Sequence, residues 1–331
     1  MKKKIVLVLI FMFFIFSFYN LYSLTIKIGS IAPARSPWDK ALKKISREWK
    51  KISNGKINLK IYPGGIAGSE RAMIRKMKIG TLSGSLLSNV GLTSIYPDFY
   101  VINIPLLIRS DKELDFVLKG IRPIFEEQIE NKGYKVMMWS MAGWIKFFTK
   151  TKVATPDDLR KQRLFFTTGE PIIEQSWKNA GFNTIPIELK DLMVSLQSGM
   201  VNAFFMPPLV AASGQYFALA PNMMSLNVAP VYGAVVINKN KWERVPKAIR
   251  KELLLIAEKI AKELDEETKV LEVEAINTMK EHGLILNQLK QEDIKKWEKE
   301  SDINVKFLKG KVFSDEIYQK IKRLIIEFRN P

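Results

Sequence analysis

The side chains that most often perform chemistry in proteins are scarce in this sequence. It contains no cysteine and one histidine, His282, so it offers neither a cysteine–histidine nucleophile pair nor a histidine metal cluster. The acidic run Asp265-Glu266-Glu267 is consecutive, and its carboxylates diverge around a helix rather than converge on one ion. We expect no catalytic residue, no metal and no cofactor. A Ser-Lys or paired-carboxylate enzyme stays open because residues far apart in sequence can meet in space, although no motif points to one.

The charge and glycine patterns do not indicate phosphate or nucleic-acid binding. The formal net charge is +18, but the lysines between Lys247 and Lys269 are interleaved with glutamates at helical spacing, as on a solvated helix face. Gly64, Gly65 and Gly68 precede a predicted helix without the Gly-Lys-Ser/Thr of a phosphate-binding loop. We therefore expect no nucleic-acid partner and no nucleotide.

Two aromatic pairs, Phe165-Phe166 and Phe204-Phe205, could each place one ring against solvent or a ligand and the other in the core. Each lies near the end of a predicted strand, where alternation sends one member of a pair to either face. The surrounding sequence predicts strands over 163–167, 184–187 and 201–206, a helix opened by Glu170-Pro171, and a helix over 189–197. Such helix–strand units favour an open α/β sheet, in which ligands bind beyond the carboxyl ends of the strands.

The remaining chain is long enough for two domains, with about 300 residues after a predicted secretory signal. Lys2, Lys3 and Lys4 precede the apolar run 5–18, and the small residue Ser23 ends a signal over residues 1–23. An uncleaved membrane anchor is the alternative. The absence of cysteine excludes a lipid-anchored form and a disulfide framework.

The rest of the chain also predicts alternating strands and helices. Strands are predicted over 24–28, 57–61, 83–89 and 232–238, and another begins at 135 and is broken at Gly143. Helices are predicted to begin at Ser36-Pro37, to run from near Ser69 to Lys78, and to run from Pro246 to about Glu281.

Several motifs resemble the solute-binding proteins of TRAP transporters, the DctP type. P-D-D-L at 156–159 and L-Q-S-G-M-V-N-A at 196–203 correspond to P-E-D-L-K-G-x-K-I-R and L-Q-x-G-x-V-D-G in that family. Four further motifs occur in the same order along the chain as in the family. They are G-G-x-x-G-S-E at 64–70, Tyr96-Pro97, Pro105-Leu106-Leu107 and an N-K-x-x-W-x-x-L-P-like segment at 238–246. The resemblance covers nearly all of the chain after the predicted signal.

The resemblance implies an α/β, two-domain, periplasmic-binding-protein-like fold with an interdomain cleft and a long spanning helix. Domain I is expected over 24–146 plus 236–280, and domain II over 147–235 plus 281–331. The implied protein is an exported, periplasmic receptor that closes around a small-molecule ligand and delivers it to a TRAP membrane permease. Some family members also work with a tetratricopeptide-repeat protein. A receptor of this kind is not an enzyme.

Departures from the family pattern determine the expected ligand. The arginine that clamps a substrate carboxylate in the family corresponds to Phe165, and the acidic residue of V-D-G corresponds to Asn202. The resemblance also places Asn89 at the cleft and a basic residue near Lys146. The candidate ligand-binding residues are Phe165, Phe204, Trp144, Asn89, Phe147, Lys146 and Asn202.

An apolar pocket built from the aromatic candidates leads to the hypothesis of a hydrophobic or weakly polar ligand, ahead of a dicarboxylate or sialic acid. Three alternatives stay open. Lys146 or Arg163 binds a carboxylate in place of the missing arginine, Phe165 points into the core, or the protein is a ligand-independent scaffold or sensor for a partner protein.

Overall fold

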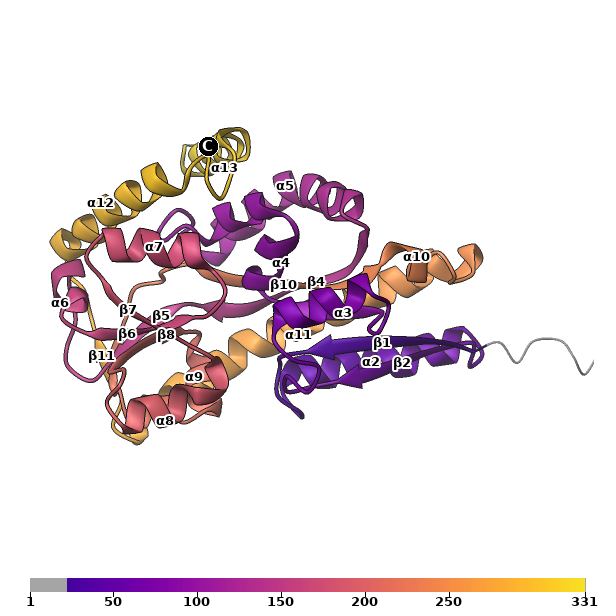
Figure 1. Cartoon of the computed structure of the whole chain (residues 1–331), viewed down its shortest axis with the longest axis horizontal. Helices are drawn as coiled ribbons and strands as arrows, with labels where there is room; N and C mark the ends of the chain where they lie inside the picture. The colour runs from indigo at the N-terminus through magenta and orange to yellow at the C-terminus, as the bar shows by residue number, and fades with distance from the viewer. Residues whose placement is uncertain (1–22, 331) are drawn as a thin grey trace, which may run out of the picture.

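The computed structural model describes residues 23–330, so the predicted signal lies outside the described residues except for Ser23. The described chain forms two β-sheets with helices packed around them (Figure 1). We call the part built on the five-stranded sheet the first domain and the part built on the six-stranded sheet the second domain. The predicted two-domain α/β fold is confirmed.

The first sheet has the strand order β2-β1-β3-β10-β4. Strand β1 is parallel to β2 and β3, whereas β10 is antiparallel to both of its neighbours, β3 and β4. A late segment of the chain therefore lies inside a sheet begun by the N-terminal segment. The strands are β1 (Leu24–Ser30), β2 (Ile57–Tyr62), β3 (Gly84–Leu87), β4 (Tyr134–Trp144) and β10 (Pro230–Asn238).

Helices cover both faces of the first sheet, and their starts follow the predicted caps. The Ser36 hydroxyl accepts from the backbone N–H of Asp39, and Ser69 likewise accepts from Ala72 at the next helix. The apolar side of the first helix, including Leu42 and Trp49, is buried against the sheet. The elements are α2 (Pro37–Ile52), α3 (Glu70–Lys78), α4 (Asn89–Ile95), the 3-10 helix η1 (Pro97–Asn103), α5 (Asp111–Asn131) and α10 (Lys239–Trp242).

The second sheet has the order β11-β9-β5-β8-β6-β7, and the predicted strand over 163–167 coincides with β6. Its strands are β5 (Lys146–Thr149), β6 (Arg163–Thr167), β7 (Asn183–Ile187), β8 (Ala203–Met206), β9 (Asn222–Met224) and β11 (Ile285–Asn287). Its short helices are α6 (Pro156–Arg160), α7 (Pro171–Asn179), η2 (Leu189–Asp191), α8 (Leu192–Gln197), α9 (Pro208–Ser213) and η3 (Tyr216–Ala218).

One long helix, α11 (Lys247–Glu281), connects the two domains and confirms the predicted spanning helix (Figure 1). Near its start Leu253 packs in the core between α2 and the first sheet. Near its end Met279 packs in the core of the second domain. At 1.5 Å per residue this helix is roughly 50 Å long, enough to contact both domains.

The C-terminal helices belong to different domains. Helix α12 (Gln291–Leu308) packs on α6 and α7 of the second domain, whereas α13 (Asp315–Arg329) returns to α5 of the first. The carboxylate of Asp98 accepts from the backbone N–H and hydroxyl of Ser314 and fixes the start of α13. Domain II is predicted over 147–235 plus 281–331. Within that range, β10 pairs with β4 of the first sheet from Pro230 onward, and α13 packs on α5.

Candidate ligand-binding site

A cavity of about 90 Å³ lies where the chain crosses between the domains. It is bounded by α4 and η1 on one side and by β5, β6, β8 and α7 on the other. Two segments that join the sheets also line it, at Ile145 and at Val228 and Ala229. Most of its wall is apolar. Its lining residues are Asn89, Val90, Thr93, Tyr100, Asn103, Pro105, Ile145, Phe147, Phe166, Thr167, Glu170, Ile173, Trp177, Phe205, Val228 and Ala229.

Strand alternation decides which phenylalanines line this cavity. Phe147 of β5 is paired with Phe205 of β8, and both line the cavity together with Phe166 of β6. The other members of the two aromatic pairs, Phe165 and Phe204, lie on the opposite face in the core of the second domain.

The ring of Phe204 stacks on Phe148 at a centroid separation of 4.8 Å. Phe165 is 3 % exposed and shares that core with Leu192 and Val201. Both candidates therefore stabilise the sheet from the face away from the cavity.

Trp177 of α7 completes the aromatic wall of the cavity. Its indole stacks on Phe205 with centroids 6.1 Å apart and meets Phe147 edge-on at 6.1 Å. Phe166 packs against Phe205 at 5.9 Å. These rings fix one another's orientation, so the wall is preformed rather than assembled from mobile side chains.

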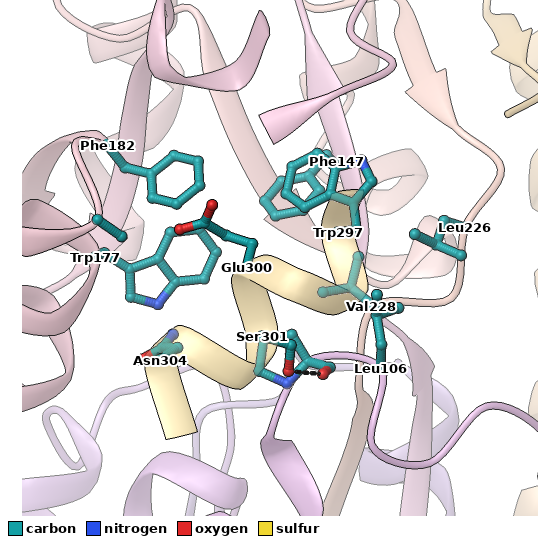
Figure 2. A pocket seen from close by; sticks show the side chains of 12 residues that line it. Leu106, Phe147, Trp177, Phe182, Leu226, Val228, Trp297, Glu300, Ser301 and Asn304 are labelled. Carbon is teal, nitrogen blue, oxygen red and sulfur yellow. Dashed lines mark hydrogen bonds between the residues drawn. The ribbon is translucent and has the colours of Figure 1, made fainter. Parts of the chain in front are cut away.

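A second, smaller cavity of about 20 Å³ lies behind this wall, between α7 and α12 (Figure 2). Phe147 and Trp177 line both cavities, so their rings form the partition between them. From α12, Trp297 stacks on Phe147 at 5.4 Å, and its indole N–H donates to the carbonyl of Ala154. Ser301, also from α12, donates to the carbonyl of Pro105 in the first domain. Helix α12 thus closes the apolar end of the site.

Two polar side chains that line the 90 Å³ cavity have acceptor atoms that receive no hydrogen bond from the described residues. Asn103 is 7 % exposed; its Nδ2 donates to the carbonyl of Pro230, and its buried Oδ1 has no partner among the described residues. Glu170 precedes α7, and no hydrogen bond to its carboxylate forms within residues 23–330. Burial raises the pKa of Glu170 to about 7; the nearby Glu70 carboxylate adds to the rise, and Arg71 opposes it.

Glu70 and Arg71, whose charges both act on Glu170, make different contacts. Glu70 accepts from the Ser88 backbone at 2.5 Å, the Ser88 hydroxyl at 2.9 Å and the Gly91 backbone at 3.1 Å, so it caps α4. Burial raises the pKa of Glu70 despite these bonds. The guanidinium of Arg71 lies against Gly169, just before α7. No lysine or arginine is among the residues that line the cavity.

The remaining sequence-predicted residues are divided between the cavity and other places. Asn89 lines the cavity from the start of α4, as Phe147 does from β5. Asn202 instead accepts from the backbone N–H of Arg163 at 2.7 Å and joins β6 to the turn before β8. It holds the strand ends in register.

Trp144 and Lys146 face away from the cavity. The Trp144 indole donates to Asp111 at 2.7 Å and lines a separate cavity of about 300 Å³ between α5, β4 and α11. The Lys146 ammonium donates to the carbonyl of Ser225. Burial lowers the pKa of Lys146 to about 8, against the opposing effect of Glu272, whose own pKa burial raises to about 7. Lys146 is therefore not placed to contact a ligand in the cavity.

Five residues that define the cavity are not among the sequence-predicted ligand-binding residues: Phe166, Phe205, Trp177, Glu170 and Asn103. Phe166 and Phe205 belong to the two aromatic pairs, but strand alternation alone does not show which face of the sheet borders the cavity. Glu170 was recognised only as the start of a helix. Nothing in the sequence near Asn103 indicated a buried amide at a cavity.

Among residues 23–330, no three or more acidic, histidine or cysteine side chains are grouped to hold a metal ion. No helix in the same range combines the length and apolar composition needed to cross a membrane.

Comparison with known proteins places this geometry in a family. The model for bacterial extracellular solute-binding protein family 7, DctP, matches residues 28–310. A protein of Haemophilus influenzae is 22 % identical over 308 residues, covering 93 % of this chain and 88 % of that protein. The C4-dicarboxylate-binding periplasmic protein DctP of Rhodobacter capsulatus is 21 % identical over 286 residues, covering 83 % of each chain.

Solved structures share the fold at low sequence identity. A TRAP periplasmic solute-binding protein from Ralstonia eutropha with bound (S)-2-acetolactate matches with a TM-score of 0.84 at 20 % identity, over 92 % of this chain and all of that one. A similar protein from Sulfurospirillum deleyianum with bound succinate has a TM-score of 0.81 at 18 % identity, over 91 % of this chain and 98 % of the other. Both of these neighbours were solved with small carboxylates.

Proposed function

Since the chain belongs to the bacterial extracellular solute-binding proteins of family 7, we propose that it captures a small hydrophobic or weakly polar ligand between its domains and delivers it to a TRAP membrane permease. Proteins of this family are receptors for solutes, and the chain is a binding protein rather than an enzyme. The proposed ligand differs from the acids bound by the structural neighbours.

The observation that supports this ligand is the composition of the cavity wall. Phe147, Phe166, Trp177 and Phe205 provide aromatic surface, and no basic side chain lines the cavity. Burial of apolar surface against this wall contributes roughly 25 cal/mol per Å² before the costs of association. A carboxylate would lose its hydration without gaining a charge-assisted partner in the wall, a cost of several kcal/mol.

A small carboxylate is the competing ligand, and the position of Arg71 favours it. The guanidinium lies against Gly169, beside the cavity residue Glu170, and is the cation whose charge acts on that carboxylate. A domain movement that brought Arg71 inward would supply the cation that Phe165 does not. Lys146 and Arg163 are less suited: Lys146 donates to Ser225 across the sheet, and Arg163 donates to the carbonyl of Gly199.

Calorimetric titration of the purified protein with matched apolar, neutral polar and carboxylate ligands separates the two. We expect apolar ligands to bind, Phe205→Leu to weaken binding at least fivefold, and Phe204→Leu, which removes a ring from the opposite face, to leave it unchanged in folded protein. Preferential binding of a carboxylate that is lost in Arg71→Met and kept in Lys146→Met would establish the competing ligand instead.

The export and partner proposals rest on the sequence and the family. We propose that the signal over residues 1–23 directs the chain to the periplasm, where the receptor meets the permease; an uncleaved signal would keep it on the membrane. A tetratricopeptide-repeat partner remains a further proposal from the family resemblance. Affinity purification from membranes with ligand present, followed by mass spectrometry, tests both partners, and recovery of neither protein would contradict the delivery step.

A further inference from the structure

We propose that the ligand carries a small cationic hydrogen-bond donor, an ammonium group, which binds between the Glu170 carboxylate and Asn103 Oδ1. Its carbon skeleton then lies against Phe147, Trp177 and Phe205. This inference rests on the proposed function, because it names the polar end of the ligand for the same cavity. It adds a positive charge to a ligand that the wall alone describes only as apolar.

Asn103 determines the kind of hydrogen bond that the cavity offers. Its Nδ2 donates to the carbonyl of Pro230 at 3.1 Å, and exchanging the two amide atoms would set oxygen against oxygen. The free atom is therefore Oδ1, an acceptor, and it is buried without a partner among the described residues. A buried acceptor without a donor is costly, so this site favours a ligand that donates.

Glu170 adds a second acceptor and a charge. Its carboxylate lines the same cavity and accepts no hydrogen bond within residues 23–330. The charged and titratable groups that act on it are Glu70 and Arg71 of α3 and Tyr100 of η1. Glu70 is committed to the cap of α4, and Arg71 lies against Gly169 outside the cavity lining. The charge presented to a ligand inside the cavity is therefore that of Glu170.

The aromatic wall suits a cation as well as a hydrocarbon. The faces of aromatic rings attract ammonium groups, most strongly where water is excluded. Tyr100 and Phe166 line the same cavity as Glu170, and so does Trp177 of α7, the helix that Glu170 precedes. An anion in the same position would be repelled by the Glu170 carboxylate and by the Asn103 Oδ1 acceptor. It would lose its hydration without gaining a hydrogen-bond donor.

The size of the cavity limits the group it holds. Its volume is about 90 Å³, whereas an apolar cavity of about 150 Å³ accommodates benzene. A short alkylammonium fits this space better than a sugar acid.

The test uses three probes with one carbon skeleton: butylammonium, butan-1-ol and butyrate. Calorimetric titration of the purified protein at pH 8 should give butylammonium the highest affinity, at least tenfold above butyrate. Because burial raises the pKa of Glu170 to about 7, lowering the pH from 8 to 6 should weaken butylammonium binding about tenfold and affect butan-1-ol little. Butylammonium itself stays charged across this range.

Two variants locate the effect. Glu170→Gln should remove both the preference for the cation and its pH dependence, while leaving butan-1-ol binding within about twofold of wild type. Glu174→Gln is the matched control, since Glu174 lies on α7 one turn after Glu170, pairs with Lys178 and does not line the cavity. It should behave as wild type.

The possible failures are distinct. Equal binding of butylammonium and butan-1-ol, unchanged in Glu170→Gln, would overturn the cation and leave the apolar ligand in place. Tightest binding of butyrate would overturn both proposals. Absence of binding by all three probes at millimolar concentration would contradict the cavity as a ligand site and therefore both proposals as well.

Discussion

Arg71 of the first domain lies against Gly169 of the second: a Cβ built at Gly169 would be 3.1 Å from Arg71 Nε. Gly169 also has φ +102°, in the region that favours glycine. The close approach and the backbone conformation together explain why a residue without a side chain precedes Glu170. This contact joins α3 to the segment that carries the cavity carboxylate.

Gly169→Ala should therefore affect the domain contact in addition to the backbone. Strain at positive φ costs about 1 to 3 kcal/mol of unfolding free energy, and the new methyl group also displaces Arg71. Gly133→Ala is the matched control, with φ +89° and no neighbouring atom within 4 Å of the added Cβ. Urea unfolding and ligand titration should show similar strain in both variants, with altered ligand affinity only in Gly169→Ala. Identical affinities in the two variants would argue against a role for the Arg71–Gly169 contact in binding.

The pH dependence of the unfolding free energy should include the titration of the Glu170 carboxyl group. Burial raises its pKa from 4.5 to about 7, so the folded state keeps a proton that the unfolded state releases. Its contribution to stability is complete below pH 4.5 and is lost as the pH rises through 7. Relative to wild type, Glu170→Gln should gain about 1 to 2 kcal/mol of unfolding free energy between pH 5 and pH 8. Urea unfolding at both pH values measures this, with the exposed Glu127→Gln as control, and a pH-independent difference would contradict the buried carboxylate.

Ligand binding should close the cleft. The cavity is lined from both domains, so a ligand that contacts both sides stabilises the closed arrangement over the open one. Small-angle scattering of ligand-free and saturated protein should show a decrease in the radius of gyration. An unchanged radius in a sample that calorimetry shows to be saturated would favour a ligand-independent scaffold.

The mature protein should begin at Leu24. The basic, apolar and small-residue order of the N-terminal segment predicts cleavage after Ser23, and Leu24 is the first residue of β1. Intact mass of protein recovered from the periplasmic fraction checks this directly. A mass that retains Met1, with the protein in the membrane fraction, would identify the segment as an anchor.

Local sequence patterns specify the main helices and strands, and ordered motifs indicate the family. The Ser36 and Ser69 caps begin α2 and α3, and the strand predicted over 163–167 is β6. The helix predicted from Pro246 to about Glu281 is α11. These features are local, because caps, turns and periodicity act within a few residues of the chain. The ordered motifs then indicated the family and its two-domain architecture.

Only the tertiary structure decided which side chains meet at the cavity. Alternation separates Phe165 from Phe166, but the face that becomes the cleft depends on α7 and on the first domain packing above it. Asn103 and Glu170 are distant in sequence, and both residues line one cavity because the first domain packs against β6 and α7 of the second. Lys146 faces Ser225 instead of a ligand because its neighbour Phe147 takes the cavity side of β5. Burial, charge and free hydrogen-bonding capacity at a site arise from contacts between distant segments, which local sequence patterns do not specify.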